Sequence, residues 1–343
     1  MADAGTRTGG HHEHHGDRHH ATLVTQTNLV SDQPGVATIT DPNLVNPWGL
    51  SHGPTTPVWA SDNGTNVSTL YTGDVGATPV SKVPLTVSIP DGAPSGQVFN
   101  DTTEFAVPGP GTPAAFIFTG EAGKIWAWNQ AAGPTAVQVA STDGAVYKGL
   151  TMINGPAGPE LLAANFHDNR IDVFDGQFNR LPDHGRFRDR FLPRGYAPFN
   201  VAAFNDEVFV SYAQQDAAGM DDVAGPGHGF IDVYSDSGRF VRRLVSGGVL
   251  NSPWGMTIAP WGFGHVGGDL LVGNFGDGRI HAFDPWSGEP RGTLRDASGP
   301  LTIDGLWALI VGDSAAGGTD TIWFSAGPDD EQHGLLGVLR PQL

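Results

Sequence analysis

A short pattern that recurs along the chain constrains its fold more than any other feature. The stretch Asn46-Pro47-Trp48-Gly49-Leu50 is echoed by Ser252-Pro253-Trp254-Gly255-Met256. The second copy is followed by two runs of alternating residues, 269–275 and 279–283, and the turn Gly276-Asp277-Gly278 between them is typical of a tight β-hairpin. A strand followed by a hairpin is therefore the unit that repeats.

This unit can be placed six times along the sequence. A single sheet of this kind cannot bury its own apolar face, so the sheets must stack in a ring. The spacing of roughly 45 to 55 residues is the range of four-stranded propeller blades. We therefore predict an all-β fold, a six-bladed β-propeller of four-stranded blades that forms one domain over residues 21–343. The inner strands are expected around Leu50, Phe105, Leu150, Val201, Met256 and Leu306.

The two ends of the chain are expected to meet. The last blade shows only three strands of its own, at 306–311, 321–325 and 335–340, whereas the run 22–30 alternates like a strand and precedes the first blade. We predict that 22–30 supplies the fourth, outer strand of the last blade and closes the ring, because closure removes exposed sheet edges.

Two further segments carry local predictions. The mixed-charge stretch 186–190 is expected to form the outer strand of blade three. The insertion 214–229 in blade four, which is irregular and contains Gly and Asp, is expected to be a surface loop over one mouth of the channel.

Composition excludes several function classes. The chain has 36 Asp and Glu against 18 Lys and Arg, so it offers no basic stripe for nucleic acid or an anionic membrane. It has no apolar run long enough for a membrane span. The absence of Cys excludes thiolate catalysis, disulfides and Cys-based zinc sites.

The first 20 residues form a His-rich arm that is predicted to be disordered, because it has no apolar periodicity. Its histidines could hold a divalent ion. A purification tag or a spacer would explain the same composition, and the polar start indicates that any signal peptide has been removed.

Polar residues are expected to gather at one mouth of the channel. In a propeller, the start of each inner strand and the hairpin between the second and third strands lie on the same face. Asn46, Trp48, Asn100, Asn165 and Trp254 are therefore candidate ligand-binding residues. The two tryptophans would equally fit a packing role.

Four residues from different blades form a candidate metal site: Glu104, Asn200, Asn251 and Asp304. Hard oxygen ligands favour Ca²⁺ or Mg²⁺, with Zn²⁺ or Cu²⁺ as further candidates. The alternative is that these amides and carboxylates bond to backbone groups where strands begin.

Lys148 and His167 are the candidate catalytic residues. Lys148 could move protons if burial lowers its pKa, or it could form a structural ion pair with Glu104 or Asp304. His167 could transfer protons or be an ordinary surface residue. The turn Asp329-Asp330-Glu331 fits a cation site and a solvated acidic turn equally.

Six stretches resemble an uncharacterised family of exported bacterial propeller proteins. They are Asn28-Leu29-Val30-Ser31-Asp32, the segment 41–50, Tyr147-Lys148-Gly149-Leu150, Tyr196-Ala197-Pro198-Phe199-Asn200, the segment 250–255 and Ile303-Asp304-Gly305-Leu306-Trp307. The resemblance implies export, to the extracellular space or the periplasm, but no settled activity. More distantly, the Pro-x-Gly-apolar strands are similar to NHL-repeat and gluconolactonase-like propellers. The latter hold a divalent ion with Glu, Asn and Asp and open lactones by metal-assisted attack of water.

Two hypotheses follow. The first is an exported enzyme, a metal-assisted hydrolase of the lactonase type or a lyase, which acts on a small polar molecule at the channel mouth. The second is a non-catalytic propeller that binds a ligand, a glycan or a protein.

Overall fold

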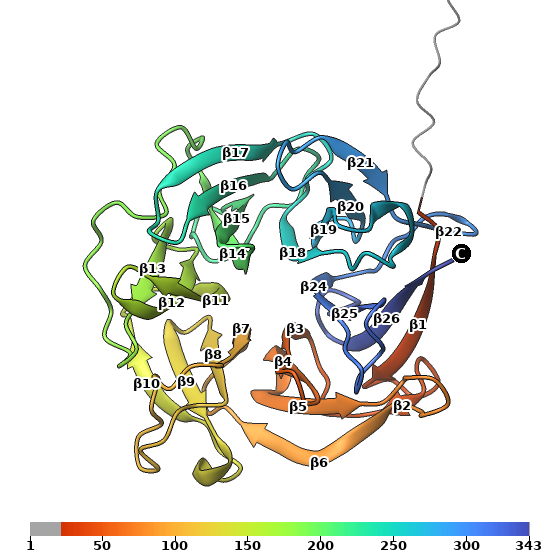
Figure 1. Cartoon of the computed structure of the whole chain (residues 1–343), viewed down its shortest axis with the longest axis horizontal. Helices are drawn as coiled ribbons and strands as arrows, with labels where there is room; N and C mark the ends of the chain where they lie inside the picture. Colours follow the sequence, from red (N-terminus) through yellow and green to blue (C-terminus); the bar gives the residue numbers. More distant parts are fainter. Residues whose placement is uncertain (1–21, 343) are drawn as a thin grey trace, which may run out of the picture.

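Six β-sheets surround a central axis in the computed structural model, which describes residues 22–342 (Figure 1). The His-rich arm lies outside the described residues. Between Thr22 and Gln342, no helix is long and apolar enough to cross a membrane. The fold class predicted from the recurring unit, a six-bladed β-propeller, is confirmed.

The strands follow the blades in chain order. Blade one contains β3 (Pro47–Ser51), β4 (Val58–Asp62), β5 (Val67–Thr72) and β6 (Ser81–Ser88). Blade two contains β7 (Pro94–Phe99), β8 (Phe116–Gly120), β9 (Lys124–Trp128) and β10 (Val137–Ser141). Blade three has only β11 (Tyr147–Gly155), β12 (Gly158–Asn165) and β13 (Arg170–Phe174). Blade four contains β14 (Tyr196–Phe204), β15 (Glu207–Gln214), β16 (Phe230–Ser235) and β17 (Phe240–Ser246). Blade five contains β18 (Pro253–Ile258), β19 (Leu270–Asn274), β20 (Ile280–Phe283) and β21 (Pro290–Thr293).

Blade six combines both ends of the chain. Its strands are β24 (Leu306–Val311), β25 (Ile322–Ala326), β26 (Leu335–Pro341), β1 (Val24–Ser31) and the short β2 (Ile39–Thr40). A separate hairpin, β22 (Arg295–Asp296) and β23 (Gly299–Pro300), precedes it. Three 3-10 helices complete the described chain: η1 (Asn63–Thr65), η2 (Gln130–Ala132) and η3 (Gly264–Val266).

The Pro-x-Gly pattern has a steric cause. A Cβ atom on Gly49 would lie 2.5 Å from the carbonyl oxygen of Ser95 in the next blade, and one on Gly96 would lie 2.4 Å from the backbone nitrogen of Leu150. At Gly49 and Gly96 the inner strands therefore approach each other so closely that only glycine fits.

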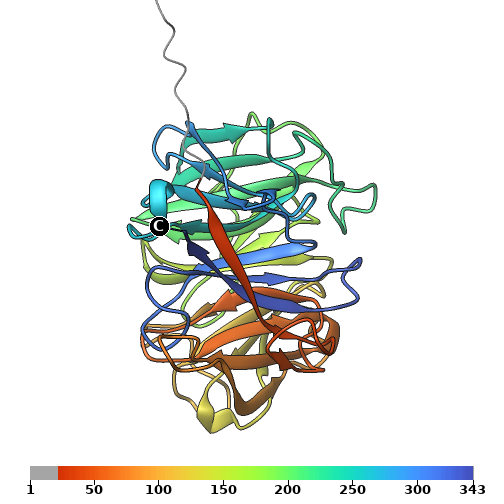
Figure 2. The same cartoon turned by 90° about the vertical axis from the view of Figure 1, so that its right-hand side faces the viewer.

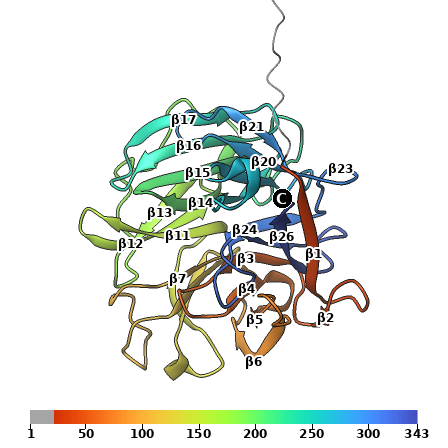
Figure 3. The same cartoon turned by 45° about the vertical axis from the view of Figure 1, so that its right-hand side comes forward.

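The ring is closed by β1, as the sequence predicts. β1 pairs antiparallel with β26, from Val24 opposite Pro341 to Ser31 opposite Leu335. Figures 2 and 3 show the two strands side by side at the edge of the last blade. Beyond β1, the Asp32 carboxylate accepts hydrogen bonds from the backbone nitrogen of Gly334 at 2.8 Å and lies 2.8 Å from Nδ1 of His333. The N-terminal segment is thus joined to the last blade by backbone and side chain.

The predicted position of the inner strand of blade two, around Phe105, is wrong. The strand is β7, and Phe105 lies in the loop after it with a φ of 61°. Pro94-Ser95-Gly96 repeats the Pro-x-Gly pattern, but Gln97 stands where the other copies have an apolar residue. The amide nitrogen of Gln97 donates a hydrogen bond to the carbonyl oxygen of Gly49 at 3.0 Å, so the donor of this polar side chain is paired inside the ring.

The expected outer strand of blade three is also wrong, because residues 186–190 form no strand. The guanidinium of Arg186 contacts Glu160 at 2.6 Å, while the next residue, Phe187, is buried with a φ of 52° and packs against Tyr234. Two consecutive inward side chains are incompatible with the period of two that a strand requires.

Closure predicts a measurable loss of stability. Leu29 on β1 is 1% exposed, so Leu29→Ala should lower the free energy of unfolding by about 2–5 kcal/mol through lost burial and a cavity. Thr25→Ala, at an exposed position of the same strand, should change it by about 0.5 kcal/mol or less. Urea unfolding measures the free energy of unfolding of both variants. Equal stabilities of Leu29→Ala and Thr25→Ala would contradict a closing role for β1.

Candidate functional site

One face of the propeller collects the starts of the inner strands and the hairpins between second and third strands. The strand register shows this directly, because Pro47 lies opposite Asp62, Tyr147 opposite Asn165 and Pro253 opposite Asn274. We call the opening of the channel on this face the mouth. The predicted geometry is therefore correct.

A buried lysine lies at the mouth, where the chain enters blade three. Lys148, at the start of β11, has its Nζ 2.5 Å from Oε1 of Glu121 and 3.1 Å from Oδ1 of Asp221. Glu121 comes from the β8–β9 turn of blade two, and its other oxygen accepts a hydrogen bond from Asn63 of blade one at 3.2 Å. Asp221 belongs to the insertion after β15, so the prediction that this insertion reaches the mouth is confirmed.

Lys148 remains an ammonium group. Burial alone would lower the pKa of Lys148, but the Glu121 and Asp221 carboxylates more than offset this and raise it. Its partners are not Glu104 or Asp304, which the sequence offered. A lysine with a raised pKa donates hydrogen bonds and stabilises negative charge rather than accepting a proton.

Glu331 is the group in the mouth whose charge changes near neutral pH. Burial, and then repulsion from Glu121, raises the pKa of Glu331 to about 7, although Lys148 opposes the shift. Asp221 and Asp222 of the insertion contribute further repulsion. Burial also raises the pKa of Asp222. Glu121, Lys148, Asp221, Asp222 and Glu331 thus form one electrostatically coupled group, which we call the mouth cluster.

Sequence reasoning named the segments that carry this cluster but missed Asp221, Asp222 and the partnership with Glu121. The sequence places Glu331 on this face, in an acidic turn, but does not connect it with Lys148. The turn holds Asp329, Asp330 and Glu331 at φ values of 61°, 52° and 65°, which side chains other than glycine rarely adopt. Three consecutive left-handed residues are a property of the folded turn that residue types alone do not reveal.

An aromatic layer forms the floor of the mouth. The Trp307 ring is sandwiched between Trp48 at 3.7 Å and Phe275 at 4.0 Å between ring centroids, and Trp254 meets it edge-on at 5.6 Å. The Nζ of Lys148 lies 5.0 Å above the Trp48 ring. Trp48 and Trp254 are 2% and 4% exposed, so the two candidate ligand-binding tryptophans pack into this layer.

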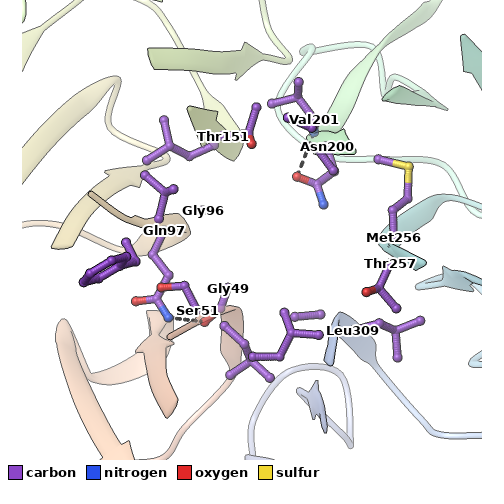
Figure 4. A pocket seen from close by; sticks show the side chains of 18 of the residues that line it. Gly49, Ser51, Gly96, Gln97, Thr151, Asn200, Val201, Met256, Thr257 and Leu309 are labelled. Carbon is purple, nitrogen blue, oxygen red and sulfur yellow. Dashed lines mark hydrogen bonds between the residues drawn. The ribbon is translucent and has the colours of Figure 1, made fainter. Parts of the chain in front are cut away.

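Below the layer, the inner strands of all six blades line a cavity of about 490 Å³ (Figure 4). Its wall alternates aliphatic side chains, such as Val201, Met256 and Leu309, with the hydroxyls of Thr151 and Thr257. Trp254 belongs to its lining, as do residues from the far ends of the inner strands. The aromatic layer therefore lies between this cavity and the charged mouth.

The four candidate metal residues do not come together. Glu104 lies beyond the end of β7, on the face opposite the mouth, and accepts a hydrogen bond from Gln177 at 2.8 Å. The amide of Asn200 donates to the carbonyl oxygen of Trp254 at 2.7 Å and thereby links two blades. Asn251 accepts from the backbone nitrogen of Gly225 at 2.6 Å, and Asp304 from that of Asp329 at 2.9 Å.

These residues bond to backbone groups or neighbouring side chains, as the alternative interpretation expected. Within residues 22–342, no three His, Cys, Asp or Glu side chains are grouped as ligands for a metal ion.

The remaining candidates have structural partners. Asn46 accepts a hydrogen bond from the Trp307 indole at 3.0 Å, and the buried Asn165 donates to Asp172 at 2.8 Å. Asn100 donates to the carbonyl oxygen of Ala114 at 2.9 Å, beyond the end of β7. His167 is 41% exposed and lies 3.2 Å from the carboxylate of the neighbouring Asp168. The structure brings none of the four into the mouth cluster as a direct partner of Lys148.

The fold and the mouth cluster together define a six-bladed propeller that carries a group of charged side chains above an aromatic layer. No family model matches the chain. It is 33% identical to "Uncharacterized protein R648" of Acanthamoeba polyphaga mimivirus, covering 94% of this chain and 82% of the relative. It is 34% identical to "Uncharacterized protein L690" of the same virus, covering 91% and 84%. The chain belongs to the family of these two proteins.

These relatives are viral, so they do not support the expected bacterial family, and their names do not bear on export, which stays a prediction. Three solved structures share the fold, and each alignment covers 93% of this chain and 98% of the other. They are an α-L-arabinanase of Penicillium chrysogenum (TM-score 0.58, 13% identity), a streptogramin B lyase (0.54, 11%) and an α-L-arabinofuranosidase of Fusarium graminearum (0.53, 12%).

The mouth cluster makes stability depend on pH. The pKa of the Glu331 carboxyl is about 7 in the folded chain against an ordinary value of 4.5. Below the lower value the group is protonated in both states; as pH rises towards the higher value, the folded chain retains a proton that the unfolded chain has lost, and wild-type stability falls.

Glu331→Gln removes this loss. The variant should therefore gain free energy of unfolding relative to wild type as pH rises from about 4 to about 8, as measured by urea unfolding. Gln332→Ala, a neutral change on the same turn, should show a difference from wild type that does not vary with pH. If the stability difference between Glu331→Gln and wild type also did not vary with pH, the raised pKa of Glu331 would be contradicted.

Proposed function

We propose that this protein is an acid-base enzyme, a hydrolase or lyase, which acts on a small polar molecule bound in the mouth. The observation that carries the proposal is the mouth cluster itself, in which a fixed ammonium group and a carboxyl that titrates near neutral pH are coupled. Groups with strongly shifted pKa values that depend on a specific charged partner are characteristic of catalytic centres.

Each member of the cluster has a distinct proposed role. Glu331 would transfer protons, because a pKa close to the working pH provides both the acid and the base form. Lys148 would stabilise negative charge that develops on a substrate oxygen, as fixed positive groups do in acyl transfer and elimination. Glu121, held by Asn63 and Lys148, would keep the ammonium in place.

Substrate binding would involve Asp221. This side chain is 74% exposed and lies on the insertion, whereas the Lys148 side chain is almost fully buried. An incoming oxygen could therefore replace the Asp221 carboxylate on Lys148 while Glu121 stays in place. The substrate class that fits is a small molecule with a carbonyl, ester or carboxylate oxygen.

The carboxylates of the mouth, Glu121, Asp221, Asp222 and Glu331, are of the residue types that Ca²⁺ and Mg²⁺ prefer, but within residues 22–342 no three of them are grouped as metal ligands. The Lys148 ammonium, however, already contacts two of these four carboxylates. An ion would have to compete with it, so we propose proton transfer by Glu331 as the primary chemistry.

A second candidate is a non-catalytic binding protein. Trp261 and Trp286 of blade five are 88% and 63% exposed. Exposed indoles are common where a protein binds a glycan or a partner protein.

Activity measurements on Glu331 test the primary proposal. Esters, lactones and glycosides would be screened with the wild-type protein, and the profile of kcat/KM against pH for any substrate found should bend near the pKa of Glu331. Glu331→Gln should lower kcat/KM by about 10²–10⁴-fold, the usual contribution of general acid-base catalysis. Glu289→Gln, at an exposed position of blade five, is the matched control.

Full activity of Glu331→Gln would refute this role. Binding of a screened compound at Trp261 or Trp286 without turnover would favour the second candidate.

A further inference from the structure

Three arginines that have no ion pair within residues 22–342 gather beside blade three. Arg188, Arg190 and Arg194 lie on the connection between β13 and β14, which runs along the outer edge of the blade where a fourth strand is absent (Figure 1). All three are exposed. In the part of the chain that the structure describes, none of them forms an ion pair, whereas Arg170, Arg186 and Arg243 of the same region do. Such a concentration of positive charge is unexpected in a chain with a formal net charge of −18.

The arginines line a pocket of about 610 Å³. Its wall is formed by the β13–β14 connection, by the β12–β13 turn and by residues of blade four such as Tyr212. Five guanidinium-bearing residues contribute to the lining: Arg170, Arg186, Arg188, Arg190 and Arg194.

The carboxylates in the lining do not neutralise the three free arginines. Asp168 contacts Arg170 at 2.8 Å, and Asp189 contacts Arg243. Asp183 accepts a hydrogen bond from the backbone nitrogen of Gly185 at 2.7 Å and has no cationic partner among the described residues. The pocket therefore keeps an excess of positive charge.

The connection that carries these arginines is anchored at several points. Arg186 forms a two-pronged ion pair with Glu160, at 3.1 Å and 2.6 Å, and donates to the carbonyl oxygen of Ser237 at 3.0 Å. Phe187 is buried against Tyr234, and the Asp189 carboxylate is buried against Arg243, which also binds Asp232. Arg188 lies between two fixed residues, so its backbone is held before any ligand arrives, which reduces the entropy cost of binding.

We propose that this pocket, which we call the arginine pocket, binds an oxyanion, the phosphate, sulfate or carboxylate group of a small ligand. The planar guanidinium group matches such groups with two parallel hydrogen bonds. Among residues 22–342, the three free arginines have no hydrogen-bond or ion-pair partner that would give them a structural role. The arginine pocket is separate from the mouth, so this inference does not depend on the proposed enzyme activity.

Calorimetric titration of the full chain with inorganic phosphate, sulfate and citrate tests the proposal. Ionic strength is held constant with sodium chloride, so that general screening is the same in every titration. We expect saturable binding of at least one of the three anions, and the one preferred identifies the oxyanion class. Changing Arg188, Arg190 and Arg194 together to Gln should weaken that binding at least about tenfold. These side chains are exposed, and an unchanged melting temperature without ligand would verify that the variant is folded.

Two matched variants distinguish a specific anion-binding site from non-specific electrostatic attraction. Arg279→Gln removes an exposed arginine of blade five that has no ion pair among the described residues and should leave binding unchanged. Changing the same three arginines to Lys keeps the charge but removes the planar guanidinium groups, which form two parallel hydrogen bonds with an oxyanion. This variant should therefore bind the anion more weakly than wild type. Equal affinity of wild type and the triple Gln variant, or no binding of any of the three anions up to about 10 mM, would overturn the proposal.

Discussion

The pairing of β1 with β26 is the interaction on which the rest of the structure depends. Six sheets can surround an axis only if the last sheet meets the first, and the chain accomplishes this by placing its N-terminal strand in its last blade. The mouth cluster takes its members from blades two, three, four and six, so it exists only in the closed ring. Closure and function are therefore linked through geometry, because a ring that opens would also separate Glu331 from Lys148.

Within the closed ring, the buried Lys148 determines the electrostatics of the mouth. Removing an ammonium group from water is unfavourable unless carboxylates compensate it, and Glu121 and Asp221 provide that compensation. The same carboxylates repel further negative charge, which is one reason that Glu331 titrates near neutral pH. The aromatic layer around Trp307 keeps this charged group apart from the aliphatic cavity below.

Much of the fold could be predicted from the sequence because it rests on repetition. The unit of a strand followed by a hairpin, placed six times along the chain, predicted the number of blades, and the missing strand of the last blade predicted the role of β1. Blade two was misplaced because Gln97 interrupts the apolar pattern while its amide satisfies a neighbouring blade. The stretch 186–190 was misread because the partners of Arg186 and Phe187 lie on other elements and are not visible from residue types.

The candidate site was predictable in position but only partly in composition. The rule that inner-strand starts and hairpins share one face led to Lys148 and to the segments that carry Asp221 and Glu331. It could not distinguish the many asparagines that bond to the backbone, such as Asn200 and Asn251, from ligands, since both uses require the same residue type at the same position. Which carboxylates meet Lys148 depends on the path of the insertion after β15 and on a left-handed turn, neither of which has a repeating signal.

The titration of the Glu331 carboxyl, followed by carbon NMR in the wild-type protein and in Lys148→Met, tests the central claim most directly. If the mouth cluster is one coupled group, Glu331 should titrate with a pKa of about 7 in the wild-type protein. Its pKa should rise further in the variant, because the lost ammonium no longer stabilises the carboxylate. A wild-type pKa near the ordinary 4.5, or a value that does not respond to the loss of Lys148, would contradict the account.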